Sequence, residues 1–253
     1  MRVAFGGAEF PCRAVAFDKD GTLFDSHHYW GVVERLRARA LADLAGEAIV
    51  PRWRKSIGVG WHGDRLVIDV AGPYAVGSVL EETILTATVL YQEGYGSWEH
   101  CREVAQGVFG RAADHLRPEE AFLPLDGARE TLRALQAAGL PVGVVTSDNR
   151  RPAEQALGLL APVQVDFLVA ADDVQRAKPF PDLMLRAAEV TGVAPEAFVV
   201  VGDSMMDLLL AKSVGAKAVA IVHRHLYSPE HVAGLEAAAD AVVDSLRQIR
   251  VVE

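Results

Sequence analysis

The chain has 253 residues, of which 51% are hydrophobic and 23% are charged, and these proportions predict a packed globular protein rather than a disordered one. This length suits one large domain or a domain that carries an inserted module. The formal net charge of −9 argues against nucleic acid as a partner, because nucleic-acid-binding surfaces are basic.

The N-terminal segment lacks the continuous apolar core of a signal peptide, because glycine, glutamate and proline interrupt it. No stretch of the sequence approaches the length of a membrane span. The two cysteines, Cys12 and Cys101, lie far apart and are expected to be buried thiols in a reducing compartment. We therefore expect a cytoplasmic protein without a membrane partner.

The first predicted strand, residues 14–17, is a short apolar run that ends at Asp18. Three stretches with amphipathic helical spacing follow, at 29–46, 75–94 and 97–116. Between the first two, residues 51–73 are rich in glycine and aromatic residues and are expected to form a loop. No strand pattern interrupts this block, so we predict a separate helical domain; the alternative is that its helices pack on one face of a sheet.

After Pro124 the pattern changes to alternating strands and helices. Short runs rich in valine and alanine fit strands that are buried on both faces of a parallel sheet, at 142–145, 167–170, 199–202, 218–222 and 241–243. Helices are expected at 126–140, 181–192 and 207–216. The alternation predicts an α/β fold, with a Rossmann-like, doubly wound parallel sheet built from residues 1–26 and 124–253 and an α-helical insertion at 27–123.

Polar side chains follow the ends of several predicted strands. Asp18, Asp20, Thr146 and Asp203 lie just past these ends, and Lys178 lies in a loop after the run 167–170. Because the carboxyl ends of parallel strands meet in one crevice, we expect these side chains to converge. Three carboxylates in one place repel each other, and a divalent cation with oxygen ligands, such as Mg²⁺, relieves the repulsion.

Four motifs, in this order and with this strand context, resemble the haloacid dehalogenase superfamily of phosphohydrolases. They are "DKDGT" from Asp18, "VGVVTSD" ending at Asp148, "AKPFPD" around Lys178 and "VVVGDSMMD" ending at Asp207. The resemblance spans nearly the whole chain. The insertion resembles the helical C1-type cap of that family, as in its phosphoglycolate phosphatases.

The resemblance implies that Asp18 is the nucleophile, which forms an aspartyl-phosphate and also binds Mg²⁺. Asp20 would be the general acid and base, and its backbone carbonyl would be a metal ligand. Residues two apart on an extended chain point to the same side, so both carboxylates can face one phosphate while Lys19 points away.

The remaining motif residues have implied roles as well. Thr146 would hydrogen-bond the phosphoryl oxygens, with Ser147 as the alternative hydroxyl, and Lys178 would neutralise the nucleophile and the phosphoryl group. Asp203 would complete the metal ligands, with Asp207 behind them. Taken alone, "GDSMMD" is equally consistent with a serine cap at the start of a helix.

Several residues of the insertion are weaker candidates. Arg52 and Arg54, in "PRWRK", are either a solvated face or part of the substrate pocket. His27 and His28 are candidates for substrate contact or for a hinge rather than for metal binding. Lys55 is the only lysine of the insertion, and its sequence context gives no specific support for a covalent role.

The sequence thus predicts a Mg²⁺-dependent phosphatase that acts on a small phosphorylated metabolite. A phosphomutase of the β-phosphoglucomutase type is the main alternative, because it also uses two aspartates. A catalytically silent module that binds Mg²⁺ or phosphate is a further alternative. Asp20 argues against a dehalogenase. The identity of the substrate and the oligomeric state are not predicted.

Overall fold

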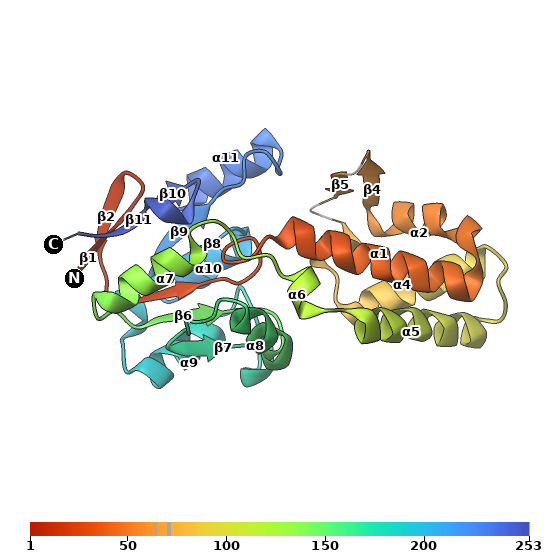
Figure 1. The fold of residues 1–253 in the computed structure, drawn as a ribbon, viewed down its shortest axis with the longest axis horizontal. Coiled ribbons are helices and arrows are strands. Elements are labelled where there is room, and N and C mark those ends of the chain that lie inside the picture. The colour runs from red at the N-terminus through yellow and green to blue at the C-terminus, as the bar shows by residue number, and fades with distance from the viewer. Residues whose placement is uncertain (64, 70–71, 253) are drawn as a thin grey trace. The chain divides into compact units, whose positions relative to one another are not determined.

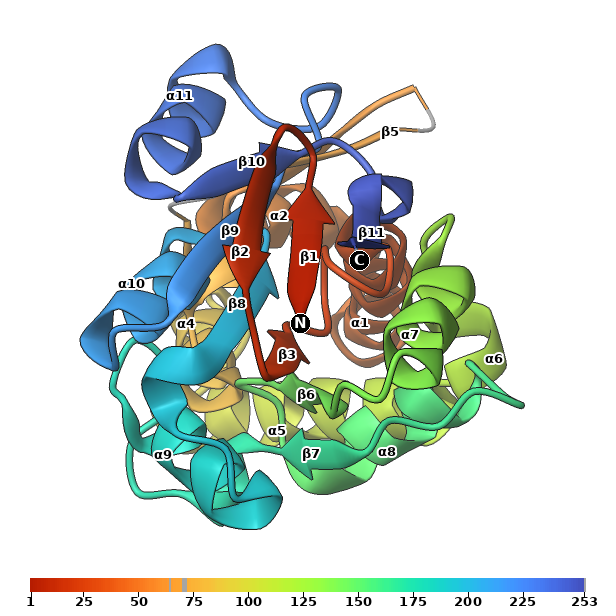
Figure 2. The ribbon, with the colours of Figure 1, turned by 90° about the vertical axis from the view of Figure 1, so that its left-hand side faces the viewer.

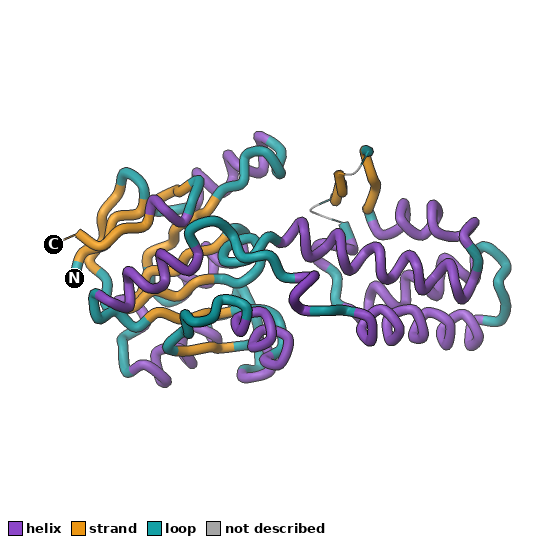
Figure 3. The backbone as a smooth tube through the Cα atoms, in the orientation of Figure 1, coloured by secondary structure: helices purple, strands orange, loops and turns teal. Residues whose placement is uncertain are grey.

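The computed structural model describes residues 1–63, 65–69 and 72–252. The chain divides into two compact units: unit 1 contains residues 1–26 and 122–253, and unit 2 contains residues 27–121. Unit 1 alternates strands with helices, whereas unit 2 is mainly helical (Figure 3). No helix in the described part of the chain is both long and apolar enough to cross a bilayer.

Unit 1 is built on a six-stranded sheet with the order β10-β9-β8-β3-β6-β7, in which every neighbouring pair is parallel (Figure 1 and, with β3 labelled, Figure 2). Its strands are Ala14–Phe17 (β3), Val142–Val145 (β6), Phe167–Val169 (β7), Phe198–Gly202 (β8), Lys217–Ile221 (β9) and Ala241–Val243 (β10). All residues of β3, β6 and β8 are buried, as expected for strands covered on both faces. The six strands predicted from the sequence and the α/β fold class are confirmed.

Helices cover both faces of this sheet. Helices α9 and α10 pack on β6–β9, and their side chains share a core with Ala14, Ala16 and Val200, while α7 contacts β6 and the small sheet described next. The helices of unit 1 are Ala128–Ala137 (α7), Arg150–Gly158 (α8), Asp182–Thr191 (α9), Met205–Ser213 (α10) and Pro229–Ala238 (α11). Short 3₁₀ turns lie at Ala171–Asp173, Pro195–Ala197 and Leu246–Gln248.

A second sheet of unit 1 joins the two ends of the chain. Strands Arg2–Phe5 (β1), Ala8–Pro11 (β2) and Ile249–Val252 (β11) form an antiparallel sheet in which β1 is central (Figure 2). The sequence analysis did not predict these strands. Each of them contains exposed residues, so they lack the fully buried apolar runs of β3, β6 and β8.

Unit 2 contains helices that lie alongside one another, with α4 packed between α2 and α5. Its elements are Ser26–Ala45 (α1, which begins one residue before the unit), a 3₁₀ turn at Glu47–Ile49, Val50–Ile57 (α2), Val59–His62 (β4), Arg65–Ile68 (β5), Pro73–Val76 (α3), Val79–Gln92 (α4), Trp98–His115 (α5) and Pro118–Ala121 (α6). The three helices predicted from amphipathic spacing are present as α1, α4 and α5.

The prediction of a loop at residues 51–73 is wrong for most of the described part of that segment. Val50, Trp53 and Ile57 are buried on one face of α2, and β4 and β5 form an antiparallel hairpin. Strands therefore do occur within the inserted block. The indole of Trp53 donates a hydrogen bond to Thr86 Oγ1 at 3.0 Å, so α2 is fixed to α4 through a buried polar contact. Residues 64, 70 and 71 of the predicted loop lie outside the described residues.

Candidate active site

Three neighbouring strands deliver polar residues to one edge of the main sheet. Asp18 follows β3, Thr146 follows β6 and Asp203 follows β8, and β3 lies between the other two strands. The backbone N–H of Asp18 donates to the carbonyl of Val201, which continues the strand pairing up to the site. The three side chains are almost wholly buried, so the fold places two carboxylates and a hydroxyl in a region of low solvent access.

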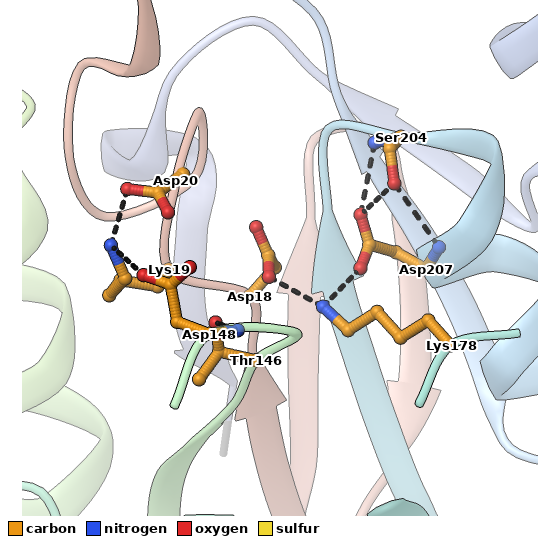
Figure 4. A network of polar contacts seen from close by, with 8 residues as sticks. All are labelled: Asp18, Lys19, Asp20, Thr146, Asp148, Lys178, Ser204 and Asp207. Atoms are coloured by element: carbon orange, nitrogen blue, oxygen red, sulfur yellow. Dashed lines mark hydrogen bonds and ion pairs between the residues drawn. The ribbon is translucent and has the colours of Figure 1, made fainter. Parts of the chain in front are cut away.

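Lys178 joins this group from the loop before α9. Its ammonium Nζ lies 2.5 Å from Asp18 Oδ1 and 2.6 Å from Asp207 Oδ1, and it bridges the two carboxylates (Figure 4). Burial lowers the pKa of Lys178, but the charges of Asp18 and Asp207 outweigh this effect and raise it above its usual value. Lys178 therefore stays cationic beside Asp18.

Asp207 is held from its other side by the start of α10. Its Oδ2 accepts hydrogen bonds from the backbone N–H and the hydroxyl of Ser204, at 3.0 and 2.6 Å, and Ser204 in turn caps the helix. The helix-cap interpretation of "GDSMMD" is therefore confirmed, and the same motif also contacts Lys178 through Asp207. One carboxylate, 1% exposed, both closes the capping box and positions Lys178.

Thr146 is fixed by a tight turn after β6. Its hydroxyl oxygen accepts the backbone N–H of Asp148 at 3.1 Å, which leaves the hydroxyl proton for donation to an anion. Ser147, the alternative hydroxyl, is exposed.

Lys19 was predicted to point away from the side that Asp18 and Asp20 share, but its side chain turns towards Asp20. Its Nζ lies 2.6 Å from Asp20 Oδ1 and 3.0 Å from Asp148 Oδ2, and the side chain is completely buried (Figure 4). The chain leaves the extended conformation after Phe17, because a bend begins here, so the two-residue alternation of a strand no longer applies. The ammonium also lies 4.6 Å from the centre of the Phe122 ring, a cation–π contact.

The carboxylates of this edge form a group that suits a cation. Asp18, Asp203 and Asp207 each offer an oxygen within 4.8 Å of the others. Burial raises the pKa of Asp18 to about 7, against the opposing charge of Lys178, and burial together with the charges of Asp18 and Asp207 raises the pKa of Asp203 well above its usual value. Lys178 alone does not compensate these charges. An oxygen-only donor set of this kind fits a hard divalent cation.

The candidate residues of the insertion lie in unit 2, where they make local contacts. Arg54 Nε donates to the fully buried carboxylate of Glu34 at 2.7 Å, and Arg52 forms a 3.4 Å ion pair with Glu93 while both side chains stay largely exposed. His28 Nε2 lies 2.8 Å from a backbone carbonyl of α6.

Sequence reasoning missed Lys19, Asp148 and Ser204 as parts of the site. A signal for Ser204 was present, because serine three residues before an acidic residue is the pattern of a capping box. The sequence carries no comparable signal for Lys19 or Asp148, because their contact depends on a bend that follows a buried strand.

Comparisons with known proteins extend over most of the chain. A family model of haloacid dehalogenase-like hydrolases matches residues 12–215. The chain is 31% identical over 220 residues to the phosphoglycolate phosphatase of Escherichia coli strain K12, covering 85% of this chain and 83% of that protein. It is 30% identical over 239 residues to the validoxylamine A 7′-phosphate phosphatase of Streptomyces hygroscopicus subsp. limoneus, covering 94% of this chain and 96% of that protein.

A solved structure also resembles the chain nearly from end to end. A HAD family hydrolase from Deinococcus radiodurans R1, with bound phosphate and sodium, has a TM-score of 0.64 at 25% sequence identity. The match covers 94% of this chain and 93% of that one.

Proposed function

The chain belongs to the haloacid dehalogenase-like hydrolases and is a phosphatase among them, and on this premise we propose that it hydrolyses a small phosphomonoester through an aspartyl-phosphate, with Mg²⁺ as cofactor. Unit 1 would be the catalytic core and unit 2 the cap. The observation that carries the proposal is the position of Lys178, whose ammonium contacts both Asp18 and Asp207.

We assign Asp18 as the nucleophile. A carboxylate that attacks a phosphate ester brings one anion towards another, so the reaction needs fixed positive charge at this point. Lys178, 2.5 Å from Asp18, supplies such charge. In the first step an oxygen of Asp18 bonds to phosphorus while the bond from phosphorus to the ester oxygen breaks. The Thr146 hydroxyl would donate to an oxygen of the phosphoryl group.

We assign Asp20 as the proton carrier. In the first step it would give a proton to the departing ester oxygen, and in the second it would take a proton from the water that attacks phosphorus. The second step releases inorganic phosphate and restores the carboxylate of Asp18. Lys19 would hold one oxygen of Asp20 in place, since the two groups are 2.6 Å apart.

The residues that would hold Mg²⁺ are Asp18 and Asp203 through their carboxylates and Asp20 through its backbone carbonyl. Asp207 would lie behind these ligands, where it contacts Lys178. When bound, Mg²⁺ would neutralise charge on the phosphoryl oxygens. Burial, together with the charges of Asp207 and Asp20, raises the pKa of Asp18 against the opposing charge of Lys178, and a bound cation would offset this effect.

We propose a small phosphorylated metabolite as the substrate, of the size that the names of the relatives indicate. Ser147 remains a proposed substrate contact, and so do Arg52 and Arg54. Of these two arginines, Arg52 is the better candidate, because Arg54 is engaged by a buried carboxylate. A cytoplasmic location forms part of the proposal and is supported by the two free, buried cysteines.

The test compares wild-type protein with Asp18→Asn on a panel of phosphomonoesters that includes phosphoglycolate and several sugar phosphates. Inorganic phosphate is measured with Mg²⁺, with EDTA, and after Mg²⁺ is restored. Asp43→Asn is a matched control, because it makes the same chemical change at a half-exposed surface residue. We expect turnover only with Mg²⁺, with full activity in the control and none in Asp18→Asn.

Two results would contradict the proposal. The first is normal phosphate release by Asp18→Asn, or by wild-type protein in EDTA. The second is isomerised sugar phosphate that depends on added bisphosphate, with little free phosphate, which would identify a phosphomutase.

A further inference from the structure

The loop between β9 and α11, residues 222–228, lies beside the carboxylate of Asp203. The loop leaves the same edge of the sheet as Asp203, because β9 pairs in parallel with β8. The hydroxyl of Tyr227 donates a hydrogen bond to Asp203 Oδ2 at 3.0 Å. The β9–α11 loop thus reaches a residue of the acidic cluster from a side that none of the four sequence motifs occupies.

The same oxygen of Asp203 is enclosed from a second side by the backbone of Gly21. A Cβ atom added to Gly21 would lie 1.8 Å from Asp203 Oδ2, and Gly21 has a positive φ of 75°, so this position requires glycine. Oδ2 of Asp203 therefore lies between Tyr227 and Gly21, so the orientation of this carboxylate is set from two sides.

The loop also contacts Gly21 directly. His223 Nε2 lies 2.6 Å from the Gly21 carbonyl oxygen, and because a carbonyl only accepts, this nitrogen carries the proton and donates. Gly21 follows Asp20, whose backbone carbonyl is an assigned metal ligand. His223 therefore fixes the peptide next to a proposed ligand, while Tyr227 fixes the carboxylate of another.

Both side chains are held in place by their surroundings. The backbone N–H groups of Leu226 and Tyr227 donate to the carbonyl of His223, at 2.8 and 3.2 Å, so a tight turn couples the two residues. The ring of Tyr227 packs 4.7 Å from that of His231, centre to centre, and a side-chain hydrogen bond links Tyr227 to Ser26. A phenol held in this way loses little freedom when it orients a carboxylate.

We propose that Tyr227 and His223 are positioning residues of the cation site, which hold Asp203 and the Asp20–Gly21 backbone in the geometry that binds the metal. The inference rests on the proposed function insofar as that function assigns a divalent cation to this carboxylate cluster. Partners that orient metal ligands usually contribute 10- to 100-fold to metal affinity or activity. Neither residue contacts the phosphoryl group in this scheme, so each acts through the ligands.

The decisive measurement is metal binding without substrate. Mn²⁺, which accepts the same oxygen ligands and has an electron paramagnetic resonance signal, is titrated into metal-free wild-type protein and Tyr227→Phe. We expect the Kd for Mn²⁺ to rise by about 10- to 100-fold in Tyr227→Phe. The concentration of Mg²⁺ that gives half-maximal activity should rise in parallel, while kcat at saturating Mg²⁺ stays close to that of the wild type. Tyr91→Phe is the matched control, because Tyr91 is 55% exposed.

His223 provides a second pair of variants, which keeps the proposal testable if Tyr227→Phe folds poorly. His223→Leu removes the donor to Gly21, whereas His223→Gln retains an N–H that can replace it. We expect weaker Mn²⁺ binding in the leucine variant and partial recovery in the glutamine variant. Wild-type affinity for Mn²⁺ in both Tyr227→Phe and His223→Leu would overturn the inference, and so would equal losses in His223→Leu and His223→Gln.

These outcomes are distinct from those that bear on the proposed function. If the wild type binds Mn²⁺ but hydrolyses no phosphomonoester, the phosphatase proposal fails and the positioning roles stand. If the wild type is an active phosphatase and the variants bind Mn²⁺ normally, the positioning roles fail and the phosphatase proposal stands.

Discussion

Burial should make the ion pair between Lys19 and Asp148 stronger than an ion pair of similar length at the surface of the same unit. Lys19 Nζ and Asp148 Oδ2 are 3.0 Å apart, and the lysine side chain is 0% exposed while that of Asp148 is 36% exposed. The comparison pair is Lys217–Asp240, at 2.7 Å, with side chains 48% and 28% exposed. On distance alone, the surface pair would be the stronger of the two.

The expected magnitude follows from charge and exposure. At an effective dielectric constant of 20, two unit charges about 3 Å apart attract each other by roughly 5 kcal/mol before desolvation is subtracted. Removal of one partner from a buried pair costs about 3–5 kcal/mol, whereas exposed pairs contribute about 0.2–1 kcal/mol. Because Asp148 retains access to water, we expect a coupling energy of about 2 kcal/mol for Lys19–Asp148 and about 0.5 kcal/mol for Lys217–Asp240.

Two double-mutant cycles measure these energies by urea unfolding followed by circular dichroism. The first uses Lys19→Met and Asp148→Asn, and the second uses Lys217→Met and Asp240→Asn. All four residues belong to unit 1, so both cycles report on the stability of the same unit. Coupling energies that agree within about 0.5 kcal/mol would refute the reasoning that burial decides the difference.

Three further predictions concern the site and the insertion. Ser204→Ala removes the cap that holds Asp207, so the free energy of unfolding should fall by about 1 kcal/mol in urea titrations, with a loss of kcat; unchanged stability would contradict this. Burial raises the pKa of Asp18 to about 7, so the metal-free native state retains a proton that the unfolded state loses, and Tm in EDTA should fall between about pH 4 and pH 7. Mg²⁺ should restore much of this loss, and a rising Tm would contradict the sign. Arg54→Met should lower Tm because it leaves the buried Glu34 without its cation, whereas Arg52→Met should leave Tm unchanged. Equal melting temperatures of the two variants would show that the Arg54–Glu34 ion pair does not stabilise the protein.

The sequence was informative where one segment by itself determined the outcome. Runs such as residues 14–17 and 142–145 consist only of residues that pack on both faces of a sheet, and each ends at a polar residue, so strands and their ends could be located. Topology then explains why Asp18, Thr146 and Asp203 meet, since their strands are neighbours. Helix α2 also has a helical pattern of apolar residues, Val50, Trp53 and Ile57, which are its buried residues. The prediction of a loop gave more weight to the glycines that follow this pattern.

The sequence was uninformative where a contact depends on the path of the backbone. Lys19 folds back on Asp20 because the strand ends at Phe17, before the residues to which the alternation was applied. Tyr227 reaches Asp203 across 24 residues, and no local spacing indicates this contact. Strands β1 and β11 pair across almost the whole chain, and no local spacing links segments this far apart, so neither end indicates its partner.

The pairing of β1 with β11 has a consequence for how the chain is made. Arg2 lies opposite Val252 and Phe5 opposite Ile249, so the central strand of this sheet has both neighbours only after residues 249–252 have left the ribosome. Until then, β1 and β2 can form only a two-stranded hairpin, which is marginally stable at best in water. The small sheet should therefore be among the last parts of unit 1 to form during translation. The same register brings the ends of the chain side by side, which makes this protein suited to circular permutation through a short peptide between residues 252 and 2.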